Sequence, residues 1–404
     1  MRTDVLVVGA GPAGSALARQ LAAGGVQVLL AERKRFPRDK PCGDFLSPQC
    51  QPLLDQLGLP RLLADLGAHR VDGMRLHDGT NVAPGAFRAV ADDAPVCGFG
   101  VRRSAFDAAL REAATDQGVA VLERHAFEAL RRDGDGRICG ARLRDADGRP
   151  VEVEARFVVG ADGVHSRVAR DLGVQQQERW LQQFALVAHF EGVAPLPSAE
   201  VHLLEGGFFA ATTVEQGLFG VNLVLPQPAL RARGERSWDA FVAERFDAAP
   251  AIAARLSAAR RLAPWRGIGP FAYRTRTQAV PGAALVGDAA GYVDPLTGEG
   301  IYFALFGARA LGRAVRRALD RPGDERSALR AYCRERQREL GPRLRVARLL
   351  QRGLRSPWVV RRVVAGLRRW PALADLVVTM SGDTVHPRQL WRPGFWRAFR
   401  EARA

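Results

Sequence analysis

The stretch Val5–Gly14 (VLVVGAGPAG) decides the fold of this chain. Four consecutive apolar residues are typical of a buried parallel strand, and three glycines follow at the spacing GxGxxG. Gly9 permits a tight turn, Gly11 lets the backbone approach a pyrophosphate, and Gly14 allows a helix to pack closely on the strand. A helix and a second strand are expected over residues 12–31, so the first segment of the chain forms a βαβ unit.

Glu32 ends the second of these strands, 18 residues after Gly14. In dinucleotide-binding folds an acidic residue at this point binds ribose hydroxyls. An acid therefore favours a ribose with free hydroxyls, as in FAD or NAD, over the phosphorylated ribose of NADP. The alternative is a glycine-rich turn beside a surface glutamate, with no ligand.

A second informative stretch is Gly287–Gly300 (GDAAGYVDPLTGEG), which follows an apolar run at residues 283–286. The pattern predicts a strand that ends at a carboxylate, a Pro/Gly-rich turn and the start of a helix. Asp288 can accept hydrogen bonds from a polyol, and free N–H groups at the helix N-terminus can face a polarised ring edge. Residues 158–167 (VVGADGVHSR) place Asp162 in a third strand–turn–helix segment. Together the segments predict one large cofactor bound by distant parts of the chain.

These three segments, in this order, resemble the class A flavoprotein monooxygenases and the geranylgeranyl-reductase-like proteins, one superfamily of FAD-dependent oxidoreductases, over residues 1 to about 310. The resemblance implies FAD as the cofactor, with Arg103 (or its neighbour Arg102) at the phosphates and Asp288 on the ribitol or pyrophosphate. The residues expected to bind FAD are Gly9, Gly11, Pro12, Ala13, Gly14, Glu32, Arg33, Cys42, Gly43, Arg103, Asp162, Gly163, Gly287, Asp288, Pro295, Thr297, Gly298, Gly300 and Ile301.

The segment Lys40–Pro48 (KPCGDFLSP) is similar to the Cys-Gly segment of the geranylgeranyl-reductase-like branch, in which this loop passes the flavin. Cys42 and Asp44 are therefore the candidates for catalytic roles, as a proton donor or as positioning groups. For Cys42 the alternative is an apolar loop residue without chemistry. His165 is a further candidate, although its position also suits a helix-start residue near the pyrophosphate.

Two features depart from known branches of the superfamily. The aromatic Tyr-x-Trp-x-Phe-Pro segment that lines the lipid cavity of many reductases corresponds here to Val221–Pro226 (VNLVLP), which has no aromatic residue. The Trp-x-Trp-x-Ile-Pro motif of flavin halogenases is not found, which disfavours halogenation. The chain also has no second GxGxxG, so NAD(P)H is expected to act as a transient electron donor rather than as a tightly bound cofactor.

The fold class expected from these signals is α/β. A Rossmann-type, glutathione-reductase-like FAD-binding domain is expected over residues 1–75, 98–172 and 265–340. An antiparallel-sheet substrate domain, interleaved with it, is expected over residues 76–97 and 173–264, where short apolar stretches alternate with polar ones. Residues 341–404 are expected to form a basic helical extension.

The function expected is FAD-dependent monooxygenation, in which a small lipophilic or aromatic metabolite is hydroxylated with NAD(P)H and O₂. Reduction of carbon–carbon double bonds in an isoprenoid or polyketide lipid is the alternative. An inactive flavin-binding scaffold is the second alternative.

The positive charge of the chain is concentrated near its C-terminal end. Residues 309–372 hold 19 Arg and 5 acidic residues, whereas the whole chain has a net charge of +16. Such a basic surface suits anionic lipid headgroups, or an acidic carrier protein that delivers a tethered substrate. The alternative is an amphipathic helical cap on the FAD-binding domain with a solvated Arg face. No nucleic-acid-binding signature accompanies the charge, so no nucleic-acid partner is expected.

Cysteine usage and hydropathy indicate the cellular compartment in which the protein is expected. The five cysteines are scattered and odd in number, which favours a reducing compartment and argues against a disulfide framework; no metal site is expected. No signal peptide and no apolar run of membrane-spanning length are apparent. The expected location is the cytoplasm, with peripheral binding to the inner membrane face as a further expectation.

Overall fold

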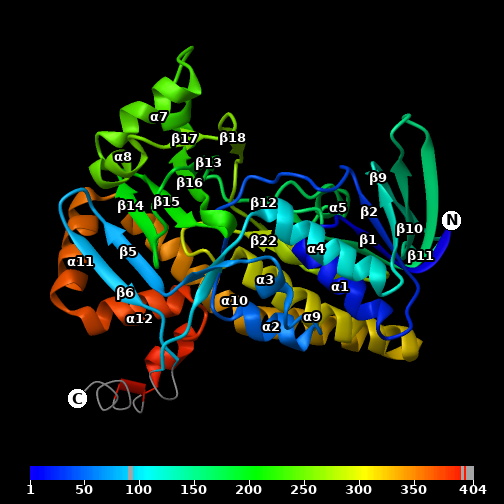
Figure 1. Cartoon of the computed structure of the whole chain (residues 1–404). Helices are drawn as coiled ribbons and strands as arrows, with labels where there is room; N and C mark the ends of the chain where they lie inside the picture. Colours follow the sequence, from blue (N-terminus) through cyan, green and yellow to red (C-terminus); the bar gives the residue numbers. More distant parts are fainter. Residues whose placement is uncertain (90–93, 393–394, 397–404) are drawn as a thin grey trace.

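Two eight-stranded sheets lie side by side, each covered by helices (Figure 1). The structure is a computed structural model that describes residues 1–89, 94–392 and 395–396. The expected α/β architecture, in which an FAD-domain sheet is combined with a largely antiparallel second sheet and C-terminal helices, is confirmed. None of the helices within the described ranges combines the length and apolar character needed to cross a lipid bilayer.

The first sheet has the order β20-β21-β11-β1-β2-β8, with parallel pairing from β21 to β8 and a β9–β10 hairpin layer attached to β11. Its strands are β1 (Arg2–Val8), β2 (Val28–Glu32), β8 (Ala120–Glu123), β9 (Ala126–Arg132), β10 (Ile138–Arg144), β11 (Pro150–Gly160), β20 (Ala279–Val280) and β21 (Ala283–Leu285).

Both faces of strand β1 are buried. Val5 and Val7 pack in a core with helices α1 (Pro12–Ala22), α4 (Arg103–Asp116) and α9 (Gly300–Asp320). Leu6 and Val8 point to the opposite face, where β9, β10 and α5 (Arg167–Asp171) pack. This two-sided burial explains why the strand is uninterruptedly apolar in the sequence.

The second sheet has the order β17-β13-β16-β15-β14-β5-β6, with β18 paired to β13. Its neighbouring strands pair antiparallel except β14 and β5, which are parallel. Its strands are β5 (Gly73–His77), β6 (Val82–Ala86), β13 (Gln183–Glu191), β14 (Ala199–Leu204), β15 (Gly207–Thr213), β16 (Phe219–Pro226), β17 (Arg260–Arg261) and β18 (Arg266–Ile268). Helices α7 (Trp238–Phe246) and α8 (Pro250–Leu256) cover its outer face.

The C-terminal helices divide between the two sheets. We call the part of the chain built on the first sheet the first domain and the part built on the second sheet the second domain. Helix α10 (Glu325–Gly353) packs along α9 on the first domain, whereas α11 (Pro357–Arg369) and α12 (Pro371–Ser381) pack on the second sheet (Figure 1). Val364 of α11 lies in one apolar cluster with Phe208 and Val224, and the backbone N–H of Ala86 in β6 donates to Asp375 of α12 at 2.8 Å. The cap expected on the FAD-binding domain therefore covers the second sheet instead, apart from α10.

The observed strands differ from the expected domain boundaries at two places in the chain. β5 begins at Gly73, so the expected boundary between residues 75 and 76 falls inside a strand of the second sheet. β18 belongs to that sheet although it lies within the expected FAD-binding range 265–340. The division into domains otherwise stays a prediction.

Short elements complete the described chain. They are β3 (Phe45–Leu46), β4 (His69–Val71), β7 (Gly98–Gly100), β12 (Gln175–Gln177), β19 (Tyr273–Thr275), β22 (Gly291–Tyr292), α2 (Cys50–Gln56), α3 (Leu62–Asp65), α6 (Gln227–Arg231) and the 3₁₀ turns at Glu215–Gly217, Gly287–Ala290, Pro322–Asp324 and Pro387–Trp391.

Candidate functional site

A cleft runs from the glycine-rich turn after β1 to the inner face of the second sheet. Its empty space, open mouth included, is about 1240 Å³. Several of the residues expected to bind FAD line it, namely Gly11, Pro12, Ala13, Cys42, Gly43, Arg103, Gly163, Asp288, Pro295, Gly298, Gly300 and Ile301. Segments that are far apart in the sequence thus meet in one place.

The glycines of the first turn have two different roles. A Cβ built on Gly9 (φ +104°) would lie 2.5 Å from the carbonyl oxygen of Ala161, and one on Gly14 would lie 1.9 Å from the carbonyl oxygen of Gly9. These two glycines allow the backbone to pack closely and do not line the cleft. A Cβ on Gly11 would meet only Arg38 Nη2, at 3.6 Å, so this glycine leaves open space in front of helix α1.

The N-terminus of α1 faces this open space. Gly11 is its N-cap residue, Pro12 opens the helix, and no side chain caps it. The N–H groups of the first turn are therefore available to an anion, and the helix dipole favours negative charge there. The residues present fit the pyrophosphate of a dinucleotide.

Glu32 belongs to a buried chain of charges beside the turn. Its Oε2 accepts from the Ala10 N–H at 3.1 Å and lies 3.5 Å from Arg38 Nε. Arg38 also reaches Asp107 at 3.3 Å, and Asp107 binds the guanidinium of Arg103 through two hydrogen bonds of 2.7 and 2.8 Å. Arg38 was not predicted, because the loop that carries it has no periodic pattern, yet it links Glu32, the acid expected to bind ribose, to Asp107.

The guanidinium of Arg103 is bound within this network through Asp107. Burial disfavours its charge, but Asp107 and Cys42 outweigh that effect and raise the pKa of the guanidinium above its ordinary value. Arg102, the alternative for the phosphate contact, pairs instead with Glu215 of the second domain. Arg33 is exposed to solvent, away from the cleft lining.

The second and third strand–turn–helix segments meet near Lys40. The carboxylate of Asp162 does not line the cleft, because it accepts from Ser166 Oγ at 2.6 Å and the Arg167 N–H at 2.7 Å and so ties the turn before α5. Asp288 lines the cleft and pairs with Lys40 Nζ at 3.6 Å. Lys40 opens the Lys40–Pro48 segment but was not predicted as a site residue. His165 is exposed just before α5, which agrees with a helix-start role.

The loop over residues 295–300 leads into helix α9, whose N-terminus has no side-chain cap. Gly298 has φ +72°, and a Cβ there would lie 2.7 Å from the ring of Phe45. Gly287 (φ +61°) likewise leaves room for Ala13, since a Cβ there would lie 2.8 Å from the methyl group of Ala13. Thr297 is buried outside the cleft lining. At Gly298 and Gly300 the loop therefore presents backbone to the cleft, whereas Pro295 and Leu296 contribute apolar side chains.

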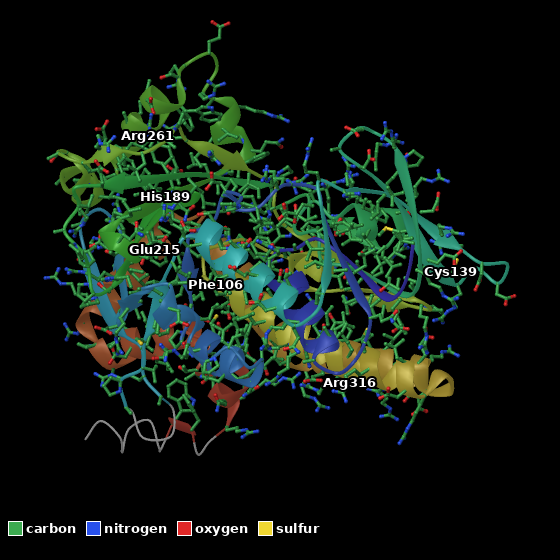
Figure 2. All side chains as sticks on the ribbon, turned by 45° about the vertical axis from the view of Figure 1, so that its right-hand side comes forward. Phe106, Cys139, His189, Glu215, Arg261 and Arg316 are labelled. Carbon is green, nitrogen blue, oxygen red and sulfur yellow. The ribbon has the colours of Figure 1, made fainter. Side chains whose placement is uncertain are left out.

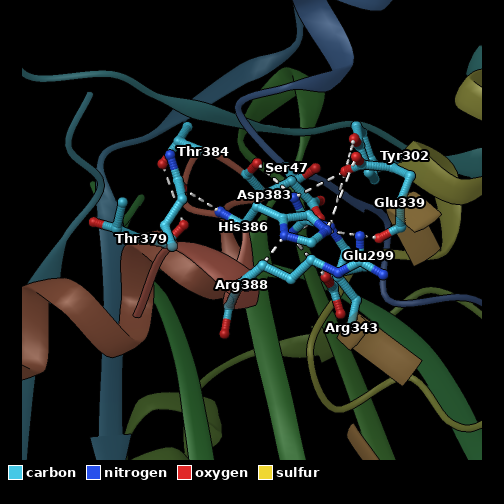
Figure 3. A network of polar contacts seen from close by, with 12 residues as sticks. Ser47, Glu299, Tyr302, Glu339, Arg343, Thr379, Asp383, Thr384, His386 and Arg388 are labelled. Carbon is cyan, nitrogen blue, oxygen red and sulfur yellow. Dashed lines mark hydrogen bonds and ion pairs between the residues drawn. The ribbon is translucent and has the colours of Figure 1, made fainter. Parts of the chain in front are cut away.

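A buried ionic network joins the loop at residues 295–300 to the C-terminal part of the chain (Figure 3). Arg343 of α10 lies 3.0 Å from Asp383 and 3.5 Å from Glu299, the residue that precedes α9. Glu339 accepts from the hydroxyl of Tyr302 at 2.9 Å and from Arg343 at 3.2 Å. Burial and the charge of Glu299 raise the pKa of Asp383 well above its ordinary value. The C-terminal segment thus holds the start of α9.

Asp44 pairs with a histidine that was not predicted. Asp44 is buried with φ +54°, accepts from the Arg103 N–H at 2.9 Å and lies 2.7 Å from His189 Nε2. Burial lowers the pKa of His189, but the hydrogen bond and charge of Asp44 outweigh it and raise that pKa. Figure 2 shows His189 and Glu215 on the second-domain side of the molecule, with Cys139 at the far end of the first sheet. Cys42 is a free, half-buried thiol that lines the cleft.

The far end of the cleft is an apolar cavity against the second sheet. Its walls come from β5, β13, β14, β15, β16, β18 and β22 and from the loops before β19 and after β22. Its apolar lining residues include Met74, Ala185, Ala199, Val201, Phe208, Ala210, Ile268, Phe271, Tyr292 and Leu296. Asn222 and Thr212 add two polar groups. Burial and the charges of Asp288 and Asp294 raise the pKa of Tyr292 well above its ordinary value, so its phenol stays protonated.

Comparison with known proteins supports the cofactor assignment. The sequence pattern of the FAD binding domain family matches residues 2–340. The chain is 32% identical over 367 residues to the chloroplastic geranylgeranyl diphosphate reductase of Oryza sativa subsp. japonica, covering 87% of this chain and 75% of that protein. It is 39% identical over 181 residues to a menaquinone reductase of Mycobacterium tuberculosis, covering 44% of this chain and 40% of that protein.

The fold is shared with solved flavoproteins. The structure of the myxobacterial chondrochloren halogenase CndH superposes with a TM-score of 0.81 at 25% identity, over 95% of this chain and 97% of that chain. This chain spans less than half the length of the menaquinone reductase it matches. The family assignment rests instead on the match over residues 2–340, which contains every predicted FAD-binding residue. The chain therefore belongs to the FAD binding domain family of FAD-dependent oxidoreductases.

Proposed function

We propose that the protein is a monooxygenase that hydroxylates a lipophilic or aromatic metabolite, with O₂ as oxidant and NAD(P)H as a transient electron donor. The observation that carries this proposal is the apolar cavity that adjoins the loop at residues 295–300. A water-poor cavity next to the flavin is what oxygen transfer to carbon requires, because water promotes loss of the activated oxygen. When bound, FAD supplies the redox chemistry, and the chain supplies position and electrostatics.

The roles of the chain follow from its geometry. The uncapped N-terminus of α1 would bind the pyrophosphate, and Glu32 would bind ribose hydroxyls. The uncapped N-terminus of α9 would stabilise negative charge on the flavin ring. Met74 and Phe208 exclude water from the substrate, and Asn222 and Thr212 give it two polar contacts that can orient it.

Reduction of a carbon–carbon double bond is the second candidate. It is supported by the likeness to geranylgeranyl diphosphate reductase over 75% of that protein. Alkene reduction needs a proton donor near the reacting carbon, and Cys42 and Tyr292 both line the cleft. The absence of cavity aromatics in the sequence of β16 is the reason for placing this function second.

One experiment separates the two functions. Extracts of a host strain that lacks the gene are incubated with the purified FAD-loaded protein, NAD(P)H and isotopically heavy O₂, once in H₂O and once in D₂O. A product that gains one heavy oxygen supports monooxygenation. A product that gains two hydrogens, with deuterium from D₂O and no heavy oxygen, contradicts monooxygenation and supports the reductase.

We also propose that the C-terminal helices bind an anionic membrane surface, from which a lipophilic substrate would be taken. Trp358 and Val363 of α11 are exposed, as are Trp370 at the end of this helix and Leu349 of α10. The helix carries arginines next to these apolar groups, and the guanidinium of Arg362 lies over the ring of Trp358 at 4.9 Å. Exposed aromatics among cations suit a lipid headgroup layer. An acidic carrier protein is the competing partner for the same surface.

A further inference from the structure

Three titratable side chains meet on the face of the second sheet that lies opposite the substrate cavity. His77 ends β5 and pairs directly with His202 of β14. Glu200 lies two residues before His202 on the same strand. Glu200 and His202 are opposite Ala211 and Phe209 of β15, which belong to the core under α7 and α8. Because side chains alternate along a strand, the three groups share this outer face.

The cluster is closed to solvent and compact. The exposed fractions of His77, Glu200 and His202 are 6%, 1% and 2%. His202 Nε2 lies 3.2 Å from Glu200 Oε2, and His77 Nε2 lies 3.9 Å from Glu200 Oε1. The two imidazole rings stack with centroids 4.1 Å apart. One potential ligand atom from each residue lies within 4.8 Å of the others.

His77 has a polar atom without a partner. Its Nε2 is buried and has no hydrogen-bond partner among the described residues, although it is directed toward Glu200. Buried side-chain nitrogens almost always have a partner. The lone pair or proton of this buried nitrogen is therefore directed at the cluster and is not used in a hydrogen bond within the described chain.

The donors are of the kind that metals bind. Imidazole nitrogens and carboxylate oxygens are common ligands of first-row transition metals in proteins. The cluster therefore combines suitable donor atoms with the compact geometry of a three-ligand site.

We propose that His77, Glu200 and His202 bind a divalent transition-metal ion through two imidazole nitrogens and one carboxylate oxygen. This donor set suits Zn²⁺ and neighbouring first-row ions rather than Mg²⁺ or Ca²⁺, which prefer oxygen alone. Arg255 of α8 donates to Glu200 Oε1 at 2.9 Å and would orient the ligating carboxylate, as groups around metal ligands commonly do. Arg75, two residues before His77 on β5, is a second arginine whose charge acts on the cluster.

The site would join the two strands that form the parallel pair of this sheet. β5 and β14 come from distant parts of the chain, and their neighbours Ala199 and Val201 line the cavity on the other face. A metal bound across them would link the two strands directly behind the cavity wall. Binding energy at such a site is also folding energy, so the ion should stabilise the second domain.

Zn²⁺ binding to the full-length, FAD-loaded protein tests the proposal. The protein is stripped with EDTA and titrated with Zn²⁺ by calorimetry, and the zinc-loaded form is studied by X-ray absorption at the zinc edge. One Zn²⁺ per chain, scattering from two imidazoles, and a raised Tm are expected. His77→Gln should weaken binding by at least about tenfold and abolish most of the rise in Tm. His125→Gln, which changes a histidine remote from the cluster, should bind as the unchanged protein does.

Two results would overturn the proposal. The first is stripped protein that takes up no Zn²⁺, or takes it up equally well after His77→Gln. The second is an absorption spectrum without two imidazole ligands. The second measurement uses only the unchanged sequence, so the proposal remains testable if His77→Gln fails to fold.

Discussion

A Cβ placed on Gly14 would lie 1.9 Å from the carbonyl oxygen of Gly9, so the first turn and the first helix touch through a contact that only glycine permits. Gly11, between them, faces open space in the cleft. The glycines of one short motif therefore have two separate roles, since two allow the backbone to pack and the third keeps the cleft open in front of helix α1.

Substitution separates these purposes. Gly14→Ala should prevent folding or greatly destabilise the protein, because its methyl group meets backbone atoms that cannot move aside. Gly11→Val should give folded protein that contains no FAD, because the side chain projects toward the pyrophosphate position. Circular dichroism and flavin absorbance of the purified proteins measure the two effects. A folded, yellow Gly11→Val protein would show that the assignment of the phosphate-binding turn is wrong.

Arg343→Met should lower the free energy of unfolding by about 3–5 kcal/mol, because it leaves the buried carboxylates of Asp383 and Glu299 without their cation. Urea unfolding measures this change. Arg338→Met, at an exposed position of the same helix, is the matched control and should change stability by less than about 0.5 kcal/mol. Equal effects of the two changes would mean that the network contributes no more than a surface charge.

Ala210→Phe should stop product formation while FAD content stays normal, because the ring would fill the cavity without entering the phosphate-binding part of the cleft. Liquid chromatography of the reaction with extract substrates measures product, and absorbance measures bound flavin. Ala232→Phe, on the solvent-exposed end of α6, serves as the control. Unchanged turnover of Ala210→Phe would place the substrate elsewhere.

The Asp44–His189 pair predicts a specific pH dependence of stability. Because the pKa of His189 is raised in the folded state, the folded protein binds more protons than the unfolded chain, in which the pKa is about 6.5. The stabilisation is complete below that value and is lost as pH rises through the folded-state pKa. His189→Gln should therefore destabilise the protein more at pH 6 than above the raised pKa. Urea unfolding at several pH values tests this, and a constant difference would contradict it.

The proposed membrane binding of helix α11 can be tested by substitution of its exposed apolar residues. The double variant Trp358→Ser/Val363→Ser should cosediment less with vesicles that contain anionic lipid, and high salt should reduce the binding of the unchanged protein. Leu262→Ser changes an exposed apolar residue outside the C-terminal helices and serves as the control. If all three proteins sediment alike, helix α11 does not contact the membrane. Binding to neutral vesicles alone would contradict the electrostatic part.

The sequence predicted those parts of the fold whose physics is local. A strand, a glycine turn and a helix lie within Val5–Gly14, so their geometry follows from neighbouring residues. Glu32 and Asp288 were likewise predicted from their places at strand ends, and the structure brings Asp288 to the cleft lining and Glu32, which is buried, to the glycine-rich turn at Ala10. Arg38 and Lys40 were missed as site residues because a loop without periodicity does not indicate where its side chains point.

The features that were not predicted depend on contacts between residues far apart in the sequence. His77 and His202 meet only because β5 pairs with β14, and neither residue lies in a recognisable motif. Helix α12 packs on β6 rather than on the FAD-binding domain, although its apolar residues alone would suit either surface. Asp383 joins the loop before α9 through Arg343, a contact between residues far apart in the sequence.

The position of α11 and α12 on the second sheet has a consequence for synthesis of the protein. A ribosome that has completed residues 1–353 has already made every strand of that sheet, yet the apolar side chains of Phe208 and Val224 still lack Val364 and Leu367 as neighbours. The FAD-binding domain can begin to assemble earlier, since its sheet and α9 are complete by residue 320. Packing of the second sheet is therefore completed last, and a nascent chain stalled before α11 would expose an apolar surface to chaperones.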